Sequence, residues 1–253
     1  MRFKTAFILI LCLQFVLCAS SAKKIQQQRE KDPRYHYNMG LFFLNNGNLD
    51  EATKYFNKCL SLNPGYSLAY NALGLVYLMK GQSEESINNF TKALKLNPKL
   101  TEAHNYMGVV YQETGLLDKA EQEFRIALAD KNYQSKELPY FNLARLYFVQ
   151  DKTQEALDYI EKSLEINKTF ILAYNLKGTI LEKMEKYVEA IKVYKIALKT
   201  APEDININFN LAVAYFKNGE VNKAKEIFEN IALKVTNEEM KKNIQQYLNI
   251  IKK

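Results

Sequence analysis

Residues 70–98 read YNALGLVYLMKGQSEESINNFTKALKLNP, and this stretch decides the fold. Its small and large apolar residues recur three or four positions apart, which is the spacing of one face of an α-helix. Gly81 interrupts the spacing near the middle, and Pro98 ends it. Glycine and proline are the residues that most often end helical segments. The stretch is therefore predicted to form two helices joined by a tight turn.

The same pattern occurs six times, with a period of 34 residues that lengthens to 36 between the third and fourth copies. Each copy has a small residue in its first half, at Gly40, Gly74, Gly108, Ala144, Gly178 and Ala212. A second small residue follows in its second half, at Ala52, Ser86, Ala120, Ala156, Ala190 and Ala224. A large residue comes one helical turn later, at Phe56, Phe90, Phe124, Ile160, Tyr194 and Phe228.

The alternation of small and large residues has a packing explanation. Two helices can approach closely where both carry small side chains, and the large residues fill the space around that contact. Glycines fall at the predicted turn between the paired helices, at Gly47, Gly81, Gly115 and Gly219. One such hairpin cannot bury its apolar face alone, so neighbouring copies must stack. The sequence therefore predicts an all-α solenoid.

The period and the residue types resemble the tetratricopeptide repeat (TPR), whose pattern includes L-G-x-x-Y, A-x-x-x-F and a terminal proline. The resemblance covers roughly residues 33–236 and implies a superhelix of helix-turn-helix units. The predicted units are 33–66, 67–100, 101–136, 137–170, 171–204 and 205–236. Tandem repeats of this type have no single central core, because each unit packs on its neighbours.

Residues 237–253 are predicted to form a helix that caps the last repeat. Thr236 and Glu239 have the spacing of a capping box. A single apolar stripe follows, made of Met240, Ile244, Tyr247, Leu248 and Ile251. A terminal helix with one apolar and one polar face is what a repeat array needs to remain soluble.

The first 22 residues have the layout of a secretory signal peptide. Arg2 and Lys4 precede an apolar run from Ala6 to Cys18, and small residues follow up to Ala22. Cleavage after Ala22 is predicted, with residues 23–32 as a polar tether and the protein exported to the periplasm or the inner face of the outer membrane. Two alternatives stay open, both tethering the protein to a membrane: an uncleaved anchor, and lipidation at Cys18. The bulky Leu17 before Cys18 argues against lipidation.

Composition and motifs give no sign of catalysis. The formal net charge is +7, but the charges alternate in sign along predicted helices, as on solvated helix faces, and do not favour nucleic acid as a partner. The two histidines, His36 and His104, occupy a repeat position that is elsewhere tyrosine. No phosphate-binding glycine loop, paired-cysteine motif or nucleophile elbow is present. The chain is predicted not to be an enzyme and to use no cofactor or metal.

The remaining candidate for function is the concave face that the first helix of each TPR unit lines, where partners of such repeats bind. Here the resemblance implies a groove for a protein or peptide segment. Its predicted residues are Tyr37, Asn38, Leu41, Asn71, Leu75, Asn105, Val109, Gln112, Asn142, Arg145, Asn175, Thr179, Phe209, Asn210 and Val213.

An asparagine occurs in every copy of this face. Asparagine amides both donate and accept, so a ladder of them suits the backbone of an extended peptide. The alternative reading is that asparagine is simply frequent in this chain and in the repeat consensus. Neither Asn105 nor Asn142 is expected at a helix-contact position.

The whole layout also resembles the type IV pilus biogenesis and stability proteins of the PilF, PilW and Tgl type. The similarity lies in the six repeats, the terminal helix and the lengthened joint that leads from Ala127 to Leu143. That family implies a pilotin, which assists assembly of an outer-membrane secretin. The pair Leu17-Cys18 departs from the usual lipidation motif of the family. The alternative is a general envelope adaptor for another complex, without a role in pili.

Overall fold

The computed structural model describes residues 28–252. The predicted signal peptide, Cys18 and the start of the predicted tether lie outside these residues. The first helices of the pairs are α2 (Pro33–Asn45), α4 (Ser67–Met79), α6 (Thr101–Glu113), α8 (Glu137–Val149), α10 (Ile171–Lys183) and α12 (Ile205–Lys217). The second helices are α3 (Leu49–Leu62), α5 (Ser83–Leu96), α7 (Leu117–Ala129), α9 (Thr153–Ile166), α11 (Tyr187–Thr200) and α13 (Val221–Ala232), and α14 (Glu238–Ile251) comes last.

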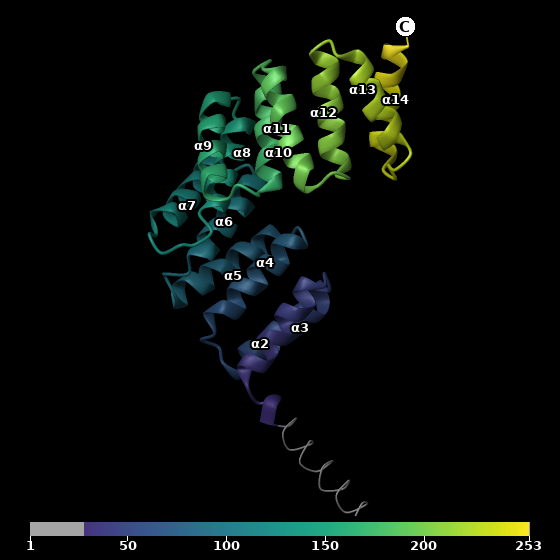
Figure 1. The fold of residues 1–253 in the computed structure, drawn as a ribbon. Coiled ribbons are helices and arrows are strands. Elements are labelled where there is room, and N and C mark those ends of the chain that lie inside the picture. Colours follow the sequence, from purple (N-terminus) through teal and green to yellow (C-terminus); the bar gives the residue numbers. More distant parts are fainter. Residues whose placement is uncertain (1–27, 253) are drawn as a thin grey trace, which may run out of the picture. The chain divides into compact units, whose positions relative to one another are not determined.

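Sequential helices pack as pairs: α2 with α3, α4 with α5, α8 with α9, α10 with α11 and α12 with α13, as Figure 1 shows for the first and last of these. The chain divides between Val110 and Tyr111 into two compact units, which are described separately. Within residues 28–252 the fold contains helices, turns and connections but no strand. No helix in that range is long and apolar enough to cross a membrane. The predicted all-α fold is confirmed.

The close approach of paired helices is visible at the repeated spacing of glycine and aromatic residues. A Cβ atom added at Gly40 would lie 2.5 Å from Cε1 of Phe56, and one at Gly74 would lie 2.6 Å from Cδ1 of Phe90. Both distances are shorter than any real contact of a Cβ atom. Only glycine fits at these two positions, so the predicted role of the small residues is confirmed. The opposing small residues are also fully buried, at Ala52, Ser86, Ala120, Ala156, Ala190 and Ala224.

The turn inside each pair requires one residue with positive φ. The four predicted turn glycines meet this need, with φ from 70° at Gly81 to 82° at Gly219. In the fourth and fifth pairs the same conformation is adopted by Asp151 (φ 61°) and Glu185 (φ 59°). A residue with a Cβ atom is strained there, because its Cβ approaches the following carbonyl oxygen. These two turns are therefore less favourable than the others.

Most joints between pairs use an asparagine to close the helix end. The Oδ1 atom of Asn63, Asn97 and Asn167 accepts a hydrogen bond from the backbone N–H two residues later, at 3.0, 3.1 and 3.0 Å. This Asx turn explains why the chain reverses there in a few residues. Residues 63–66, 97–100 and 167–170 form these short connections.

The joint between α7 and α8 differs from the others. It spans residues 130–136, because two residues are inserted and α7 ends one residue earlier in its repeat than α3, α5, α9 and α11 do. Asp130 replaces asparagine, and its Oδ1 accepts from the N–H of Asn132 at 2.9 Å. Tyr133, within the connection, has a buried side chain. The lengthened joint thus has a hydrogen-bonded turn and one buried aromatic residue.

The last helix begins one residue later than the sequence suggested. Asn237 is the N-cap of α14, and its Oδ1 accepts from the N–H of Met240 at 2.9 Å. The predicted capping box of Thr236 and Glu239 is therefore wrong: an asparagine is at least as good a cap as a threonine and stands next to it. Ile244 and Leu248 are buried, whereas Tyr247 is half-buried.

The first repeat carries an exposed aromatic residue, Phe42. Its side chain is 57% exposed. The corresponding position is fully buried in the later repeats, at Val76, Val110, Leu146, Ile180 and Ala214. Phe42 thus has the character of an interior residue but lies at the surface.

Candidate peptide-binding surface

The predicted groove residues lie on the first helices, in two sets that belong to different compact units. The first unit contains Tyr37, Asn38, Leu41, Asn71, Leu75, Asn105 and Val109, and the second contains Gln112, Asn142, Arg145, Asn175, Thr179, Phe209, Asn210 and Val213. Most of those on one helix are three or four residues apart and share a face, whereas Tyr37 and Asn38, like Phe209 and Asn210, are adjacent in sequence and lie at different angles around their helices. Partner binding at this face stays a prediction.

Two of the asparagines are buried rather than presented to a ligand. Asn105 is 3% exposed and Asn142 is 6% exposed. The expectation that neither lies at a helix-contact position is wrong. Helical periodicity places a residue on one side of its own helix, but the neighbouring elements decide whether that side is covered. These two amides contribute to packing.

Two other asparagines of the predicted groove, Asn175 and Asn210, form a hydrogen bond with each other. The Nδ2 atom of Asn210 on α12 donates to Oδ1 of Asn175 on α10, at 2.9 Å. The bond connects the first helices of neighbouring repeats and uses one of the two N–H donors of Asn210 and one acceptor site of Asn175. In the second unit, therefore, part of the asparagine ladder holds the scaffold together.

Two further amides have an unsatisfied acceptor. Oδ1 of Asn71 and Oε1 of Gln112 are buried and accept no hydrogen bond from any residue that the structure describes. A buried acceptor without a partner costs about 1–3 kcal/mol. Both atoms are too enclosed to meet a ligand without movement of their side chains.

The accessible part of the surface is mainly apolar. On α4, Leu68 and Met79 are 40% and 54% exposed, and on α8, Val149 is 65% exposed. Leu172 on α10 is 61% exposed and lies one turn before Asn175. These exposed aliphatic side chains are available to a partner, as is the amide of Asn38, which is exposed on α2.

Charged groups on the first helices are few and mostly paired. Lys217 donates to Oε2 of Glu182 at 3.1 Å, and Oε1 of Glu182 accepts from the Tyr194 hydroxyl at 2.7 Å. Burial raises the pKa of Tyr194 well above its usual range. Arg145 is an exception: it forms no ion pair with any described residue and lies 5.9 Å from the ring centre of Phe141.

The buried ionisable groups outside this surface have structural roles. Nε2 of His36 lies 2.8 Å from the carbonyl oxygen of Glu30, which ties the segment before α2 to the first repeat. Lys177, which replaces the leucine or methionine of other repeats, extends to Glu161 at 2.7 Å. Burial raises the pKa of the Cys59 thiol to about 11. Among residues 28–252, no group of metal-ligating side chains is close enough to hold an ion.

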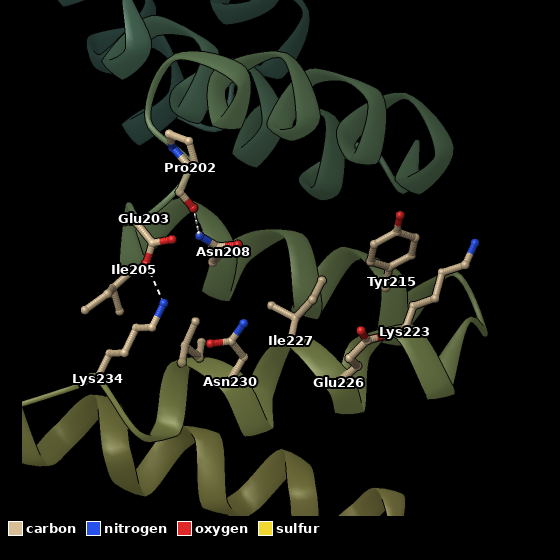
Figure 2. A pocket seen from close by; sticks show the side chains of 11 residues that line it. Pro202, Glu203, Ile205, Asn208, Tyr215, Lys223, Glu226, Ile227, Asn230 and Lys234 are labelled. Carbon is tan, nitrogen blue, oxygen red and sulfur yellow. Dashed lines mark hydrogen bonds and ion pairs between the residues drawn. The ribbon is translucent and has the colours of Figure 1, made fainter.

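A pocket of about 360 Å³ lies between α12 and α13. Figure 2 shows Lys234 reaching Glu203, and the amide of Asn208 donating to the Pro202 carbonyl oxygen. Lys223 at the far end is paired with Glu220. The sequence did not predict this pocket. Glu203, Lys223 and Lys234 are bound within the protein, and Glu226 is the charged lining residue for which the described part of the chain provides no ion pair.

A second pocket lies between α12 and α14 and is lined by Phe209, Asn243, Gln246, Tyr247 and Ile250. Only Phe209 among these was predicted as a groove residue. The other four lie on α14, which the sequence presented as a cap with a polar outer face. Their spacing of three, one and three residues was the available signal, since it places them on a single helix face.

Comparison with known proteins agrees with this geometry. Family models of the tetratricopeptide repeat match residues 33–99 and 89–122, and the model of the tetratricopeptide repeat protein 21 C-terminal ARM domain matches residues 118–247. The last match alone spans about half of the chain. The chain belongs to the tetratricopeptide repeat family. It is a TPR scaffold of the kind that mediates protein–protein interaction, a fold that is typically not catalytic.

Curated TPR relatives match only parts of the chain. The TPR repeat-containing protein MJ1428 of Methanocaldococcus jannaschii is 29% identical over 99 residues, which are 39% of this chain and 17% of that protein. The human protein O-mannosyl-transferase TMTC3 is 32% identical over 136 residues, which are 53% of this chain and 13% of that protein. The chain thus matches less than a fifth of the length of these relatives.

Solved TPR structures match nearly the whole chain. Pseudomonas aeruginosa PilF has a TM-score of 0.74 at 20% identity, over 87% of this chain and 99% of that one. PilW, described as a widely conserved type IV pilus biogenesis factor, has a TM-score of 0.77 at 16% identity, over 84% and 98%. The Cut9–Hcn1 structure has the same TM-score at 18% identity, but only 43% of that chain is covered. At 16–20% sequence identity, these similarities show a shared fold only.

Proposed function

We propose that this TPR protein is an exported scaffold that binds a protein segment along its first helices and acts as a pilotin-like factor for a type IV pilus secretin. One observation carries the proposal: the fold matches PilF and PilW over 99% and 98% of their lengths. A match from end to end means that these proteins have a similar number of repeats. That is a stronger resemblance than repeats alone provide.

Two features of the sequence support the same proposal. The charged and apolar pattern of residues 1–22 is that of an export signal, which a factor at the outer membrane needs. The lengthened joint at residues 130–136 is one of the features on which the sequence resemblance to pilus proteins rests. A membrane tether at the N-terminus, through Cys18 or an uncleaved leader, belongs to the same proposal.

The alternative is an envelope adaptor that serves a different complex. The likeness to Cut9–Hcn1, with a TM-score equal to that of PilW, favours it, because the fold alone does not select a pilus role. Both candidates use the same apolar face of the first helices. They differ in the partner.

The two candidates are separated in a strain that lacks this gene. On the pilotin proposal, heat-resistant secretin multimers disappear while pilin is still made, and a plasmid-borne copy restores the multimers. Normal multimers in the deletion strain, or a host without a secretin gene, eliminate the pilotin role and leave the adaptor. A copy without residues 1–22 is the control for export, and it should not restore the multimers.

A further inference from the structure

The last helix has an apolar face and, beside it, a face that combines apolar and amide side chains. Ile244 and Leu248 are 1% and 8% exposed, and they form the face that caps the sixth repeat. The adjoining face carries Asn243, Gln246, Tyr247 and Ile250, which line the pocket between α12 and α14 together with Phe209. A helix that served only as a cap would need the first face alone.

The floor of this pocket is a fixed aromatic cluster. The ring of Tyr247 stacks on Phe228, with ring centres 5.0 Å apart and planes inclined by 14°. The edges of two α12 rings complete the cluster, with Phe216 and Phe209 centred 5.4 and 6.1 Å from Tyr247. Ile250, 56% exposed, stands at the pocket as a large apolar side chain without cover. Tyr247 is thus packed against three phenylalanine rings of α12 and α13.

The amides at the pocket are free, unlike those one repeat earlier. Between α10 and α12, Asn210 donates to Asn175 at 2.9 Å. Between α12 and α14, the repeat position of Asn175 is occupied by Phe209, which offers no acceptor. Asn243 and Gln246 accordingly make no hydrogen bond to any residue in the described range. Two donor–acceptor groups therefore stand beside an aromatic floor with no partner.

We propose that this pocket binds an uncharged stretch of extended polypeptide through one aliphatic or aromatic side chain. The side chain rests on Tyr247, Phe209 and Ile250, and the amides of Asn243 and Gln246 bind the peptide groups on either side of it. No charged residue lines the pocket, so a lysine or aspartate side chain would lose its hydration without compensation. An amide, in contrast, matches both the N–H and the C=O of a peptide. The inference rests on the proposed function only in taking the partner to be polypeptide.

A capped amino acid tests the site without knowledge of the partner. N-acetyl-leucinamide supplies one aliphatic side chain and two peptide groups, and N-acetyl-lysinamide and N-acetyl-aspartamide are the charged counterparts. Each is titrated into the 15N-labelled chain while the backbone amide signals are followed. We expect saturable shifts at Phe209 and residues 243–250 with the leucine probe, and binding about tenfold weaker with either charged probe.

Two variants and a matched control test whether the leucine probe binds in this pocket. Ile250→Glu and Gln246→Ala should each weaken binding of the leucine probe, the former by about tenfold. Gln245→Glu adds the same charge to an exposed position of α14 outside the pocket and should leave binding unchanged. Equal binding of the three probes, shifts confined to other helices, or an unaffected Ile250→Glu variant would each overturn the proposal. Because no secretin is present in this assay, its result is independent of the pilotin proposal.

Discussion

Asn210 and Asn175 join the sixth and fifth repeats through a hydrogen bond of 2.9 Å between their side-chain amides. Changing either residue to alanine should lower the free energy of unfolding by about 0.5–1.5 kcal/mol, because one amide then loses its partner. The double variant should lose less than the sum of the two single variants. Urea denaturation of the four proteins measures this coupling. Additive losses would show that the contact contributes nothing.

The turn at Glu185 should be improved by glycine. Glu185 has a φ of 59°, and the left-handed conformation costs a residue with a Cβ atom about 1–2 kcal/mol. Part of this gain is offset, since glycine also makes the unfolded chain more flexible. Glu185→Gly should therefore raise the melting temperature. Gly81→Ala, at the same turn of the second repeat, should lower it, and the opposite signs are the check.

Gly74 should not tolerate a methyl group. A Cβ atom there would lie 2.6 Å from the Phe90 ring, which is itself fully buried. Overpacking of this kind typically costs about 1–3 kcal/mol. Gly65→Ala is a suitable control, because the nearest atom to a Cβ there is 3.4 Å away. Thermal unfolding of both variants compares them, and a stable Gly74→Ala protein would contradict the packing described here.

The Cys59 thiol should react slowly in the folded protein. Burial raises its pKa from 9.0 to about 11, so little thiolate forms at neutral pH. The neutral thiol favours the folded state up to about pH 9, and this contribution is lost as the pH rises towards 11. Ellman's reagent at pH 8 should label Cys59 only after denaturant is added, if Cys12 and Cys18 are first replaced by serine. Rapid labelling of the native protein would show that the second helix of the first repeat opens.

The mass of the mature protein should decide how the leader is processed. Cleavage between Ala22 and Lys23 predicts a chain that begins at Lys23 and contains a single cysteine, Cys59. Intact-mass measurement of the protein purified from its native envelope gives the answer. A chain that begins at Cys18 and carries acyl groups would establish the lipoprotein alternative instead.

The repeat pattern predicted contacts inside a hairpin better than contacts between hairpins. Gly74 and Phe90 meet as expected, because the spacing within one unit encodes their approach. Burial of Asn105 and Asn142 was not predicted, since it depends on how neighbouring elements pack against each helix. The free amide of Asn243 was not predicted either, for the same reason. It becomes evident only when Phe209 is seen beside α14, in the repeat position that Asn175 fills one repeat earlier.

The exposure of Phe42 makes the first and last repeats of the array differ in surface character. At one end, α14 covers the sixth repeat and exposes Gln245, Gln246 and Asn249 to water. At the other end, Phe42 keeps the apolar character of positions that are fully buried in every later repeat. An additional repeat inserted before α2 would therefore meet an apolar position of the kind that later repeats bury, whereas one attached after α14 would meet three exposed amides beside Ile250. Engineering or evolution can lengthen this scaffold more readily from its first repeat than from its last.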